Sequence, residues 1–397
     1  MERRLVHVPI ASELLVPKED TLADALRVLW LSHRDICHPS AGGAERVVFE
    51  TSKGLIRMGF KVTWGSTSFH ESKESQALEG VEIVRMGNYV SAHVKSPLLV
   101  RSVKPDVVVD DLGHVVPWCS ERLTPFPGTV HFYHLHQRTL SGQVTPALGS
   151  LLKWLERQYY WCYPRWPFVT ISEQGVQDLL DLGISRKRIS YIPVGVDLKK
   201  FYPGRKAPEP TMIYFGGFRS YKRPWIPLDV YRMLRGRVPK LRLFMVGDGP
   251  IRERFEKLTS KSNWKGVAFL GRVSDDMLSK LVSEAWVNLH CSVAEGWGLS
   301  IIEAAAAGTP TVAFSVPGVR ESVVDEVNGI LVPDGNIPAF VTAVEDVLRS
   351  PDDWVATSRA RALSHAWENS VHQWAEHLRL VACTHQPEFL RSCGTVR

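Results

Sequence analysis

Two carboxylates flank a glycine-rich turn in residues 295–303, which read Glu-Gly-Trp-Gly-Leu-Ser-Ile-Ile-Glu. Glycines let backbone amides approach a diphosphate closely, and a helix starting near Leu299 directs its unpaired N–H groups and positive dipole end at the same anion. Glu295 stays in the loop, where it can accept hydrogen bonds from sugar hydroxyls. Glu303 lies about one turn into the helix, and its side chain leans back toward a ribose beside the phosphates. The pattern is typical of a sugar-nucleotide site, and the ordinary alternative is a solvated loop glutamate followed by one that stabilises the helix dipole.

A second glycine turn, Gly42 and Gly43, follows a strand expected over residues 27–32 and precedes a helical pattern. A lone pair of glycines often makes only a tight strand-to-helix turn. The matching turn at Gly296 and Gly298 favours a different reading, in which two glycine loops face each other across a cleft and grip one diphosphate sugar. The first half of the chain then presents the acceptor.

Histidines gather in residues 131–137, which read His-Phe-Tyr-His-Leu-His-Gln at the end of an expected strand. Alternation along a strand puts His134 and His136 on one face. A buried, hydrogen-bonded histidine is the ordinary alternative for either residue. A metal site is not favoured, because no acidic partner lies nearby in the sequence.

Cations follow directly after the strand expected over residues 211–215. Arg219, Lys222 and Arg223 can place a fixed positive charge beside departing phosphates, where it opposes the negative charge that accumulates as a glycosidic bond breaks.

These residues need a scaffold of alternating strands and helices. Strands are expected over residues 27–32, 61–66, 81–86, 106–110, 128–134, 168–172 and 189–193, and again over 211–215, 241–246, 267–270, 286–291, 311–314 and 329–332. Helical patterns separate most of them, which predicts parallel, doubly wound α/β sheets. The expected organisation is an N-terminal extension (1–25), a first domain (26–200), a linker with three prolines and one glycine (201–210), a second domain (211–370) and a C-terminal segment (371–397).

Composition sets limits on these readings. The chain has 397 residues, 44% hydrophobic content and a net charge of +6, which suits a globular protein of two or three domains. The six cysteines show neither Cys-x-x-Cys nor zinc spacing, as expected for a reduced, cytosolic chain. We expect no signal peptide, no membrane-spanning segment and no nucleic-acid partner.

Residues 295–303 resemble the E-x7-E signature of the retaining glycosyltransferases of family 4, which have the GT-B fold. Further segments agree in order, namely residues 34–45, 170–173, 193–197, 216–223, 246–250 and 318–321, so that the resemblance spans roughly residues 27 to 375. It implies two Rossmann-like domains that face each other across a cleft, and last helices that return to the first domain.

The resemblance also implies roles for single residues. His136 takes the place of the family's sugar-contacting histidine, Lys222 that of its diphosphate-binding lysine, and Val273 that of a residue whose backbone holds the base. Gly217 stands where the family has an arginine, so Arg219 is the substitute expected from proximity. The catalytic residues are expected to be His136, Glu295 and Lys222, and the donor-binding residues Gly42, Gly43, Arg219, Lys222, Val273, Glu295, Gly296, Trp297, Gly298, Leu299, Ser300 and Glu303.

The sequence therefore predicts a retaining, metal-independent hexosyltransferase without a cofactor. It would move a sugar from a UDP- or GDP-linked donor to a hydroxyl acceptor, of which a lipid-linked glycan is one option that the resemblance implies. Because no side chain is an obvious nucleophile, a front-face route is expected, in which the leaving phosphate takes the acceptor proton. A sugar-nucleotide epimerase of the same fold and a non-catalytic sugar-nucleotide binding protein are the alternatives.

Residues 151–166 interleave six aromatic rings with three cations. Aromatic side chains with polar tips and long cationic side chains suit a bilayer interface, so the segment predicts peripheral docking on an anionic membrane, at its inner face. The alternative is a helix that buries Leu151, Leu155, Trp154 and Cys162 on a sheet.

Overall fold

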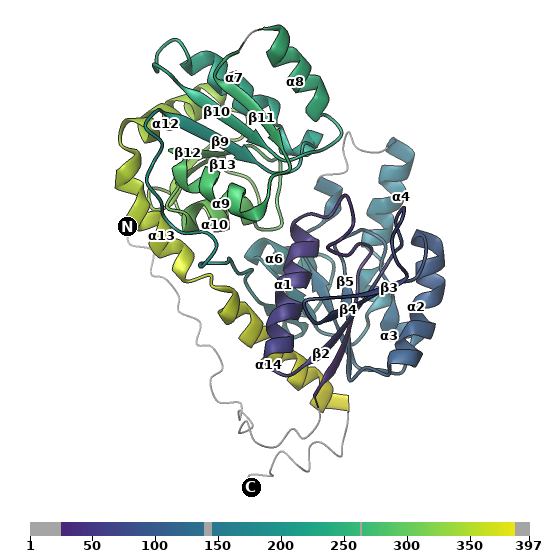
Figure 1. Cartoon of the computed structure of the whole chain (residues 1–397). Helices are drawn as coiled ribbons and strands as arrows, with labels where there is room; N and C mark the ends of the chain where they lie inside the picture. Colours follow the sequence, from purple (N-terminus) through teal and green to yellow (C-terminus); the bar gives the residue numbers. More distant parts are fainter. Residues whose placement is uncertain (1–24, 139–144, 263, 386–397) are drawn as a thin grey trace.

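A computed structural model describes residues 25–138, 145–262 and 264–385 of the chain (Figure 1). All but one residue of the extension expected over residues 1–25, and residues 386–397 of the expected C-terminal segment, lie outside the described residues.

The first domain contains a sheet of eight strands in the order β3-β4-β2-β1-β5-β6-β7-β8. All neighbours pair in parallel except β3 and β4. The strands are β1 Arg27–Leu31, β2 Lys61–Ser66, β3 Ser75–Leu78, β4 Val81–Arg85, β5 Val107–Asp111, β6 Gly128–Phe132, β7 Phe168–Thr170 and β8 Ile189–Tyr191. The sequence did not predict β3, an edge strand without β-branched or aromatic residues, which are the usual signal of a strand.

The second domain contains a parallel sheet of six strands in the order β11-β10-β9-β12-β13-β14. They are β9 Thr211–Phe215, β10 Arg242–Val246, β11 Val267–Gly271, β12 Val287–His290, β13 Thr311–Phe314 and β14 Gly329–Val332. The predicted fold class, two doubly wound parallel α/β sheets, is confirmed. Parallel strands covered on both faces read as apolar runs, which is why these strands were readable from the sequence.

Helices cover both faces of the two sheets (Figure 1). Those of the first domain are α1 Gly43–Arg57, α2 Tyr89–Val103, α3 Ser120–Leu123, α4 Pro146–Glu156, α5 Tyr159–Cys162 and α6 Glu173–Asp181, with short 3-10 turns η1 His136–Arg138 and η2 Arg186–Arg188. The second domain has α7 Trp225–Leu234, α8 Arg252–Lys261, α9 Asp275–Glu284, α10 Leu299–Ala306, α11 Val319–Ser322, α12 Ile337–Arg349 and α13 Val355–Leu363, with η3 Ser220–Lys222 and η4 Pro351–Trp354.

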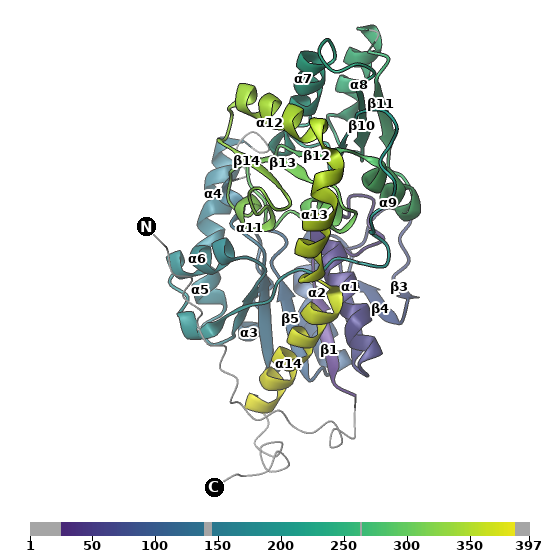
Figure 2. The same ribbon diagram turned by 90° about the vertical axis from the view of Figure 1, so that its left-hand side faces the viewer.

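The last helix, α14 Trp367–His385, lies along the first domain and packs against α1 (Figure 2). Its Val371 and Trp374 join the core cluster that includes Trp30 of β1. A Cβ atom on Gly54 of α1 would lie 2.3 Å from Cγ2 of Val371, so a larger residue at position 54 would require Val371 or the two helices to shift. The last described helix of the chain therefore packs on the first domain.

Candidate active site

The two glycine turns meet at the interface between the domains. A Cβ atom on Gly43 would lie 3.2 Å from Cδ1 of Leu299, and one on Gly296 would lie 3.2 Å from Nδ1 of His134. Gly43 opens α1 in the first domain and Leu299 opens α10 in the second. The structure therefore brings together the two loops that the sequence analysis singled out.

The donor loop, which we define as residues 295–298, follows β12 and ends where α10 begins. Gly298 has a φ of 88° and precedes the first residue of α10, a conformation that glycine adopts without strain. Trp297 is buried and anchors the loop, with its ring 4.8 Å from that of His365. Within the described part of the chain, the backbone N–H groups of Leu299 and Ser300 have no hydrogen-bond partner, so they are available to an anion at the helix N-terminus.

Glu295 forms a tight ion pair with Lys222. It also accepts a hydrogen bond of 2.5 Å from the Ser292 hydroxyl, and Nε2 of His290 lies 3.2 Å from the same oxygen. Burial alone would raise the pKa of Glu295, but Lys222 and then His290 outweigh it and hold the pKa of this carboxyl below its ordinary value. A donor that engages both residues must exchange this ion pair for its own contacts.

Glu303 lies on α10, and its side chain makes no hydrogen bond or ion pair with any described residue. Burial raises the pKa of Glu303 to about 7, although Arg46 and Lys200 act in the opposite direction. These two cations both pair with Asp275 at the start of α9, Arg46 at 3.2 Å. This network was not predictable from the sequence, because Arg46 and Asp275 are 229 residues apart and nothing local marks them as partners.

His134 and His136 occupy different places. The strand β6 ends at Phe132, so the two histidines are not aligned by strand alternation, and that prediction is wrong. Their rings nevertheless lie 4.9 Å apart. His136 begins η1, with Nδ1 3.2 Å from Oε1 of Glu156 and Nε2 3.2 Å from the Gly113 carbonyl, whereas His134 lies against the donor loop. The role expected for His136 stays a prediction, and His134 is the competing candidate.

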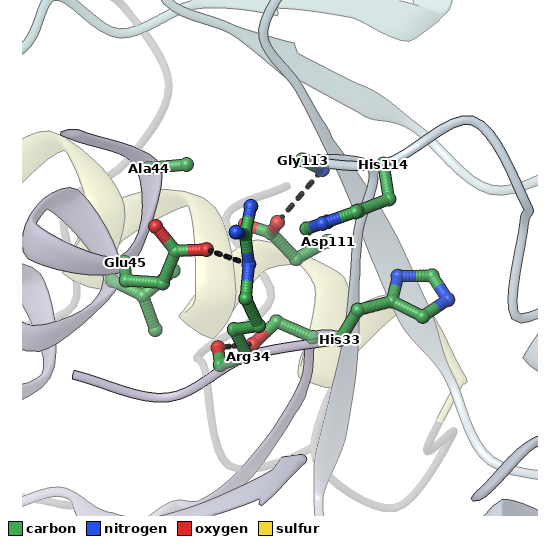
Figure 3. A pocket seen from close by; sticks show the side chains of 9 residues that line it. His33, Arg34, Ala44, Glu45, Asp111, Gly113 and His114 are labelled. Carbon is green, nitrogen blue, oxygen red and sulfur yellow. Dashed lines mark hydrogen bonds and ion pairs between the residues drawn. The ribbon is translucent and has the colours of Figure 1, made fainter. Parts of the chain in front are cut away.

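A small pocket lies beside the first glycine turn (Figure 3). Nε of Arg34 lies 3.0 Å from Oε1 of Glu45, and Oε2 of Glu45 accepts the Gly42 N–H at 2.7 Å. Across the pocket, Asp111 accepts the Gly113 N–H at 2.9 Å. Asp111 also binds the Tyr133 hydroxyl at 2.8 Å and lies 3.0 Å from Nδ1 of His131. Polar groups held in this way are suited to fix a hydroxylated ligand on the first domain.

The remaining predicted residues differ in their surroundings. Arg219 is partly exposed, and its side chain has no hydrogen bond or ion pair with the rest of the described chain. Arg223, by contrast, donates to the carbonyls of Cys291 and Ser292 and pairs with Asp334 at 2.6 Å, so its task is to hold the end of β12. Val273 follows β11 and packs, partly buried, against the same core cluster as Trp297.

Among the residues that the structure describes, no group of three His, Cys, Asp or Glu side chains is arranged to hold a metal ion. The metal independence expected above stays a prediction. None of the described helices combines the length and the apolar character needed to cross a bilayer.

Comparisons with known proteins divide the chain in the same way as the sheets do. The model of the family described as Glycosyltransferase Family 4 matches residues 41–200, and that of Glycosyl transferases group 1 matches residues 197–365. An uncharacterized glycosyltransferase of Haemophilus influenzae is 24% identical over 84% of this chain and 96% of its own length. A D-inositol 3-phosphate glycosyltransferase of Geodermatophilus obscurus is 30% identical over 48% of this chain and 46% of its own length. The chain spans about a third to a half of the length of the first curated relatives it matches.

Solved structures agree with the fold. Sucrose-phosphate synthase from Thermosynechococcus elongatus has a TM-score of 0.76 at 22% identity, covering 90% of this chain and 100% of that chain. Anabaena HepE, solved in complex with UDP and glucose, has a TM-score of 0.69 at 17% identity, covering 89% and 99% of the two chains. With the two family models together covering residues 41–365, which contain both glycine turns, the chain belongs to the family 4 glycosyltransferases, which have the GT-B fold.

Proposed function

We propose that this chain transfers a sugar, with retention at the anomeric carbon, from a nucleoside diphosphate sugar to a hydroxyl acceptor. The observation that carries the proposal is the donor loop at the N-terminus of α10, with the Lys222–Glu295 pair on one side and Glu303 on the other. Fold neighbours solved with UDP support a nucleoside diphosphate as one product.

In the proposed complex, Glu303 holds the ribose, and the Leu299 and Ser300 amides with Lys222 hold the diphosphate. Glu295, released from Lys222, accepts hydrogen bonds from sugar hydroxyls. Charge that develops on the leaving phosphate is opposed by Lys222 and the helix dipole, so that the phosphate can depart and take the acceptor proton on the same face. UDP- or GDP-linked hexoses are the proposed donors, and no metal or other cofactor takes part.

The test is a screen of nucleotide sugars by thermal shift, followed by turnover assays. A ligand at about 100 times its Kd stabilises the folded state by about 2.7 kcal/mol, which identifies the donor. Acceptor-dependent release of nucleoside diphosphate supports transfer. Epimerisation without acceptor supports the epimerase alternative, and binding without any turnover supports a binding protein.

The first domain, which is proposed to present the acceptor, carries exposed leucine and aromatic side chains on α4 and α5. The exposed residues of this surface are Leu148, Leu151, Trp154, Tyr160 and Trp161. Cys162 of α5 is buried, as the alternative of a helix packed on a sheet has it. On α4, however, the buried residues are Gly149 and Glu156, so that alternative is wrong for Leu151 and Trp154. The reason is that Glu156 turns inward to accept the backbone N–H groups of His136 and Gln137.

We propose that this exposed surface docks on an anionic membrane at its cytoplasmic face and gives access to a lipid-linked acceptor. Lys153 and Arg157 are exposed on the same helical segment, whereas the acid between them is buried. Exposed aromatic and leucine side chains next to cations fit the interface of a bilayer that carries negative charge.

Sedimentation with vesicles tests the docking proposal. Salt-sensitive pelleting with anionic vesicles is expected, and Lys153→Glu with Arg157→Glu should lower it. The matched control is Lys187→Glu with Lys265→Glu, which changes the net charge equally at exposed positions elsewhere. The proposal is contradicted if wild type and both double variants pellet equally with anionic vesicles, or if none of the three proteins pellets.

A further inference from the structure

A carboxylate of the second domain binds the start of a helix in the first. Oε2 of Glu321, on α11, accepts the backbone N–H of Glu173 at 2.7 Å, and its Oε1 accepts that of Gln174 at 2.9 Å. Glu173 and Gln174 are the first two residues of α6. We call this contact the Glu321 clasp.

The clasp completes the hydrogen bonding of the α6 N-terminus. Helices leave their first N–H groups without intrahelical partners. At α6 the Ser172 hydroxyl accepts the Gly175 N–H at 3.0 Å, and Glu321 accepts the two N–H groups before it. Hydrogen bonds from amides to an ionised carboxylate are stronger than neutral ones, and the helix dipole adds to them. The contact is therefore strong for one that joins two domains.

Glu321 is also fixed to the donor loop. Gly318, directly before α11, has a φ of 79°, and a Cβ atom there would lie 2.1 Å from the carbonyl oxygen of Glu295. The Glu295 N–H in turn donates to the Pro317 carbonyl at 3.2 Å. Arg361 of α13 holds the backbone of Glu321 through a hydrogen bond of 2.9 Å to its carbonyl. Glu321 and the donor loop must therefore move together.

The segment of the first domain that precedes α6 also contacts the donor loop directly. Cδ1 of Ile171, two residues before α6, lies 3.3 Å from the Cβ position of Gly296. The turn from β7 into α6 thus touches the donor loop at Gly296 and its supporting helix at Glu321.

We infer that Glu321 is a positioning residue that holds the donor loop against the first domain, and so sets the donor sugar opposite the acceptor. The inference rests on the proposed function. Glu321 therefore acts on the closure of the two domains and not on donor binding. The groups proposed to bind the donor, which are Glu303, Lys222 and the α10 amides, all belong to the second domain, so loss of the clasp leaves them together.

Kinetics provide the first test, with Glu321→Ala, Glu321→Gln and the control Glu253→Gln. Glu253 is an exposed acid on α8, far in sequence from the site. Glu321→Ala should lower kcat about tenfold or more while the Kd for UDP or GDP changes by no more than about twofold. Glu321→Gln, which keeps one acceptor oxygen, should fall between Glu321→Ala and wild type, and Glu253→Gln should match wild type. Wild-type kcat in both Glu321 variants overturns the inference.

Hydrogen exchange provides a test that needs no activity. In Glu321→Ala, the amides of Glu173 and Gln174 should exchange faster than in wild type, with α8 unchanged as an internal reference. Equal exchange in both proteins overturns the clasp. A wild type that shows no nucleotide-sugar turnover refutes the proposed function instead, and the exchange result still decides the clasp.

A substitution on α6, the other side of the clasp, tests the inference even if Glu321→Ala does not fold. Glu173→Pro removes one of the two donors, and proline is accepted at the first position of a helix when the preceding residue is extended, as Ser172 is. It should reproduce the loss of kcat at unchanged nucleotide affinity. Full kcat in a folded Glu173→Pro variant contradicts the inference.

Discussion

The Glu303 carboxylate, on α10, has no hydrogen-bond or ion-pair partner in the described chain, so a donor can bind it without displacing another group. Glu303→Ala should weaken donor and free nucleoside diphosphate alike, because the ribose contact exists in both complexes. The expected loss is about 1 to 3 kcal/mol for a charge-assisted hydrogen bond. Calorimetry with both ligands measures it, and unchanged affinity in a folded variant contradicts the assignment.

The raised pKa of Glu303 has a consequence for stability. The folded protein holds this proton up to about pH 7, whereas an unfolded chain releases it near the ordinary value of 4.5. The stabilising contribution is therefore complete below the unfolded pKa and is lost as the pH rises through about 7. Glu303→Gln should raise the melting temperature of the ligand-free protein more at about pH 8 than at about pH 5. An equal shift at both values would show that Glu303 titrates normally.

The two histidines near the donor loop can be separated by their effects. His134→Ala should lower turnover about tenfold or more at unchanged nucleotide affinity, because the ring lies against Gly296 of the donor loop. His136→Ala should instead lower thermal stability, since Glu156 loses a ring partner in a buried position. Turnover lost only in a stable His136→Ala variant would return the sugar contact to His136.

At the scale of elements, the sequence was most informative where strands are buried on both faces. The predicted bounds of β2, β9, β13 and β14 agree with the structure to the residue, because each strand contains a run of apolar or β-branched residues, and Gly216 and Pro333 directly follow β9 and β14. The orientation of α4 was not predictable. Its apolar positions have helical spacing, but which face turns inward is decided by Glu156 and its partners on η1, twenty residues away in sequence.

The packing of α14 on α1 yields a test at this scale. Gly54→Ala should destabilise the protein by about 1 to 3 kcal/mol, because the added methyl group overlaps Val371. Val371→Ala in the same chain should recover part of this loss, since it removes the overlapping atoms. Urea unfolding of the two single variants and the double variant measures the coupling between the two positions. Additive changes in the free energy of unfolding would show that residues 54 and 371 do not interact.

At the scale of the whole molecule, the sequence predicted which two glycine loops meet between the domains but not what holds the domains together. The glycine turns carry local signals, whereas Glu321 and Glu173 are 148 residues apart and Arg46 and Asp275 are 229 apart. Pairs of this kind arise only when the two sheets are placed against each other. No pattern within one element records them.

The proposed chemistry requires no metal, because amides and cations surround the expected diphosphate. Treatment with EDTA should therefore leave the transferase rate within about twofold of the untreated rate. The assay follows nucleoside diphosphate release with and without added magnesium or manganese. A strict requirement for either ion would refute the metal-free route.

The chain crosses between the domains twice, once at residues 194–210 and once between α13 and α14, and the two crossings run side by side. Val196 forms an isolated parallel bridge with Ala366, and its N–H donates to the His365 carbonyl at 2.7 Å. Arg359 adds hydrogen bonds to the carbonyls of Leu198 and Phe201. A single crossing would let one domain rotate about many axes relative to the other. Two crossings that are hydrogen-bonded to each other favour rotation about one axis. If the domains separate, we therefore expect a rotation about these paired crossings that moves the donor loop away from the first domain.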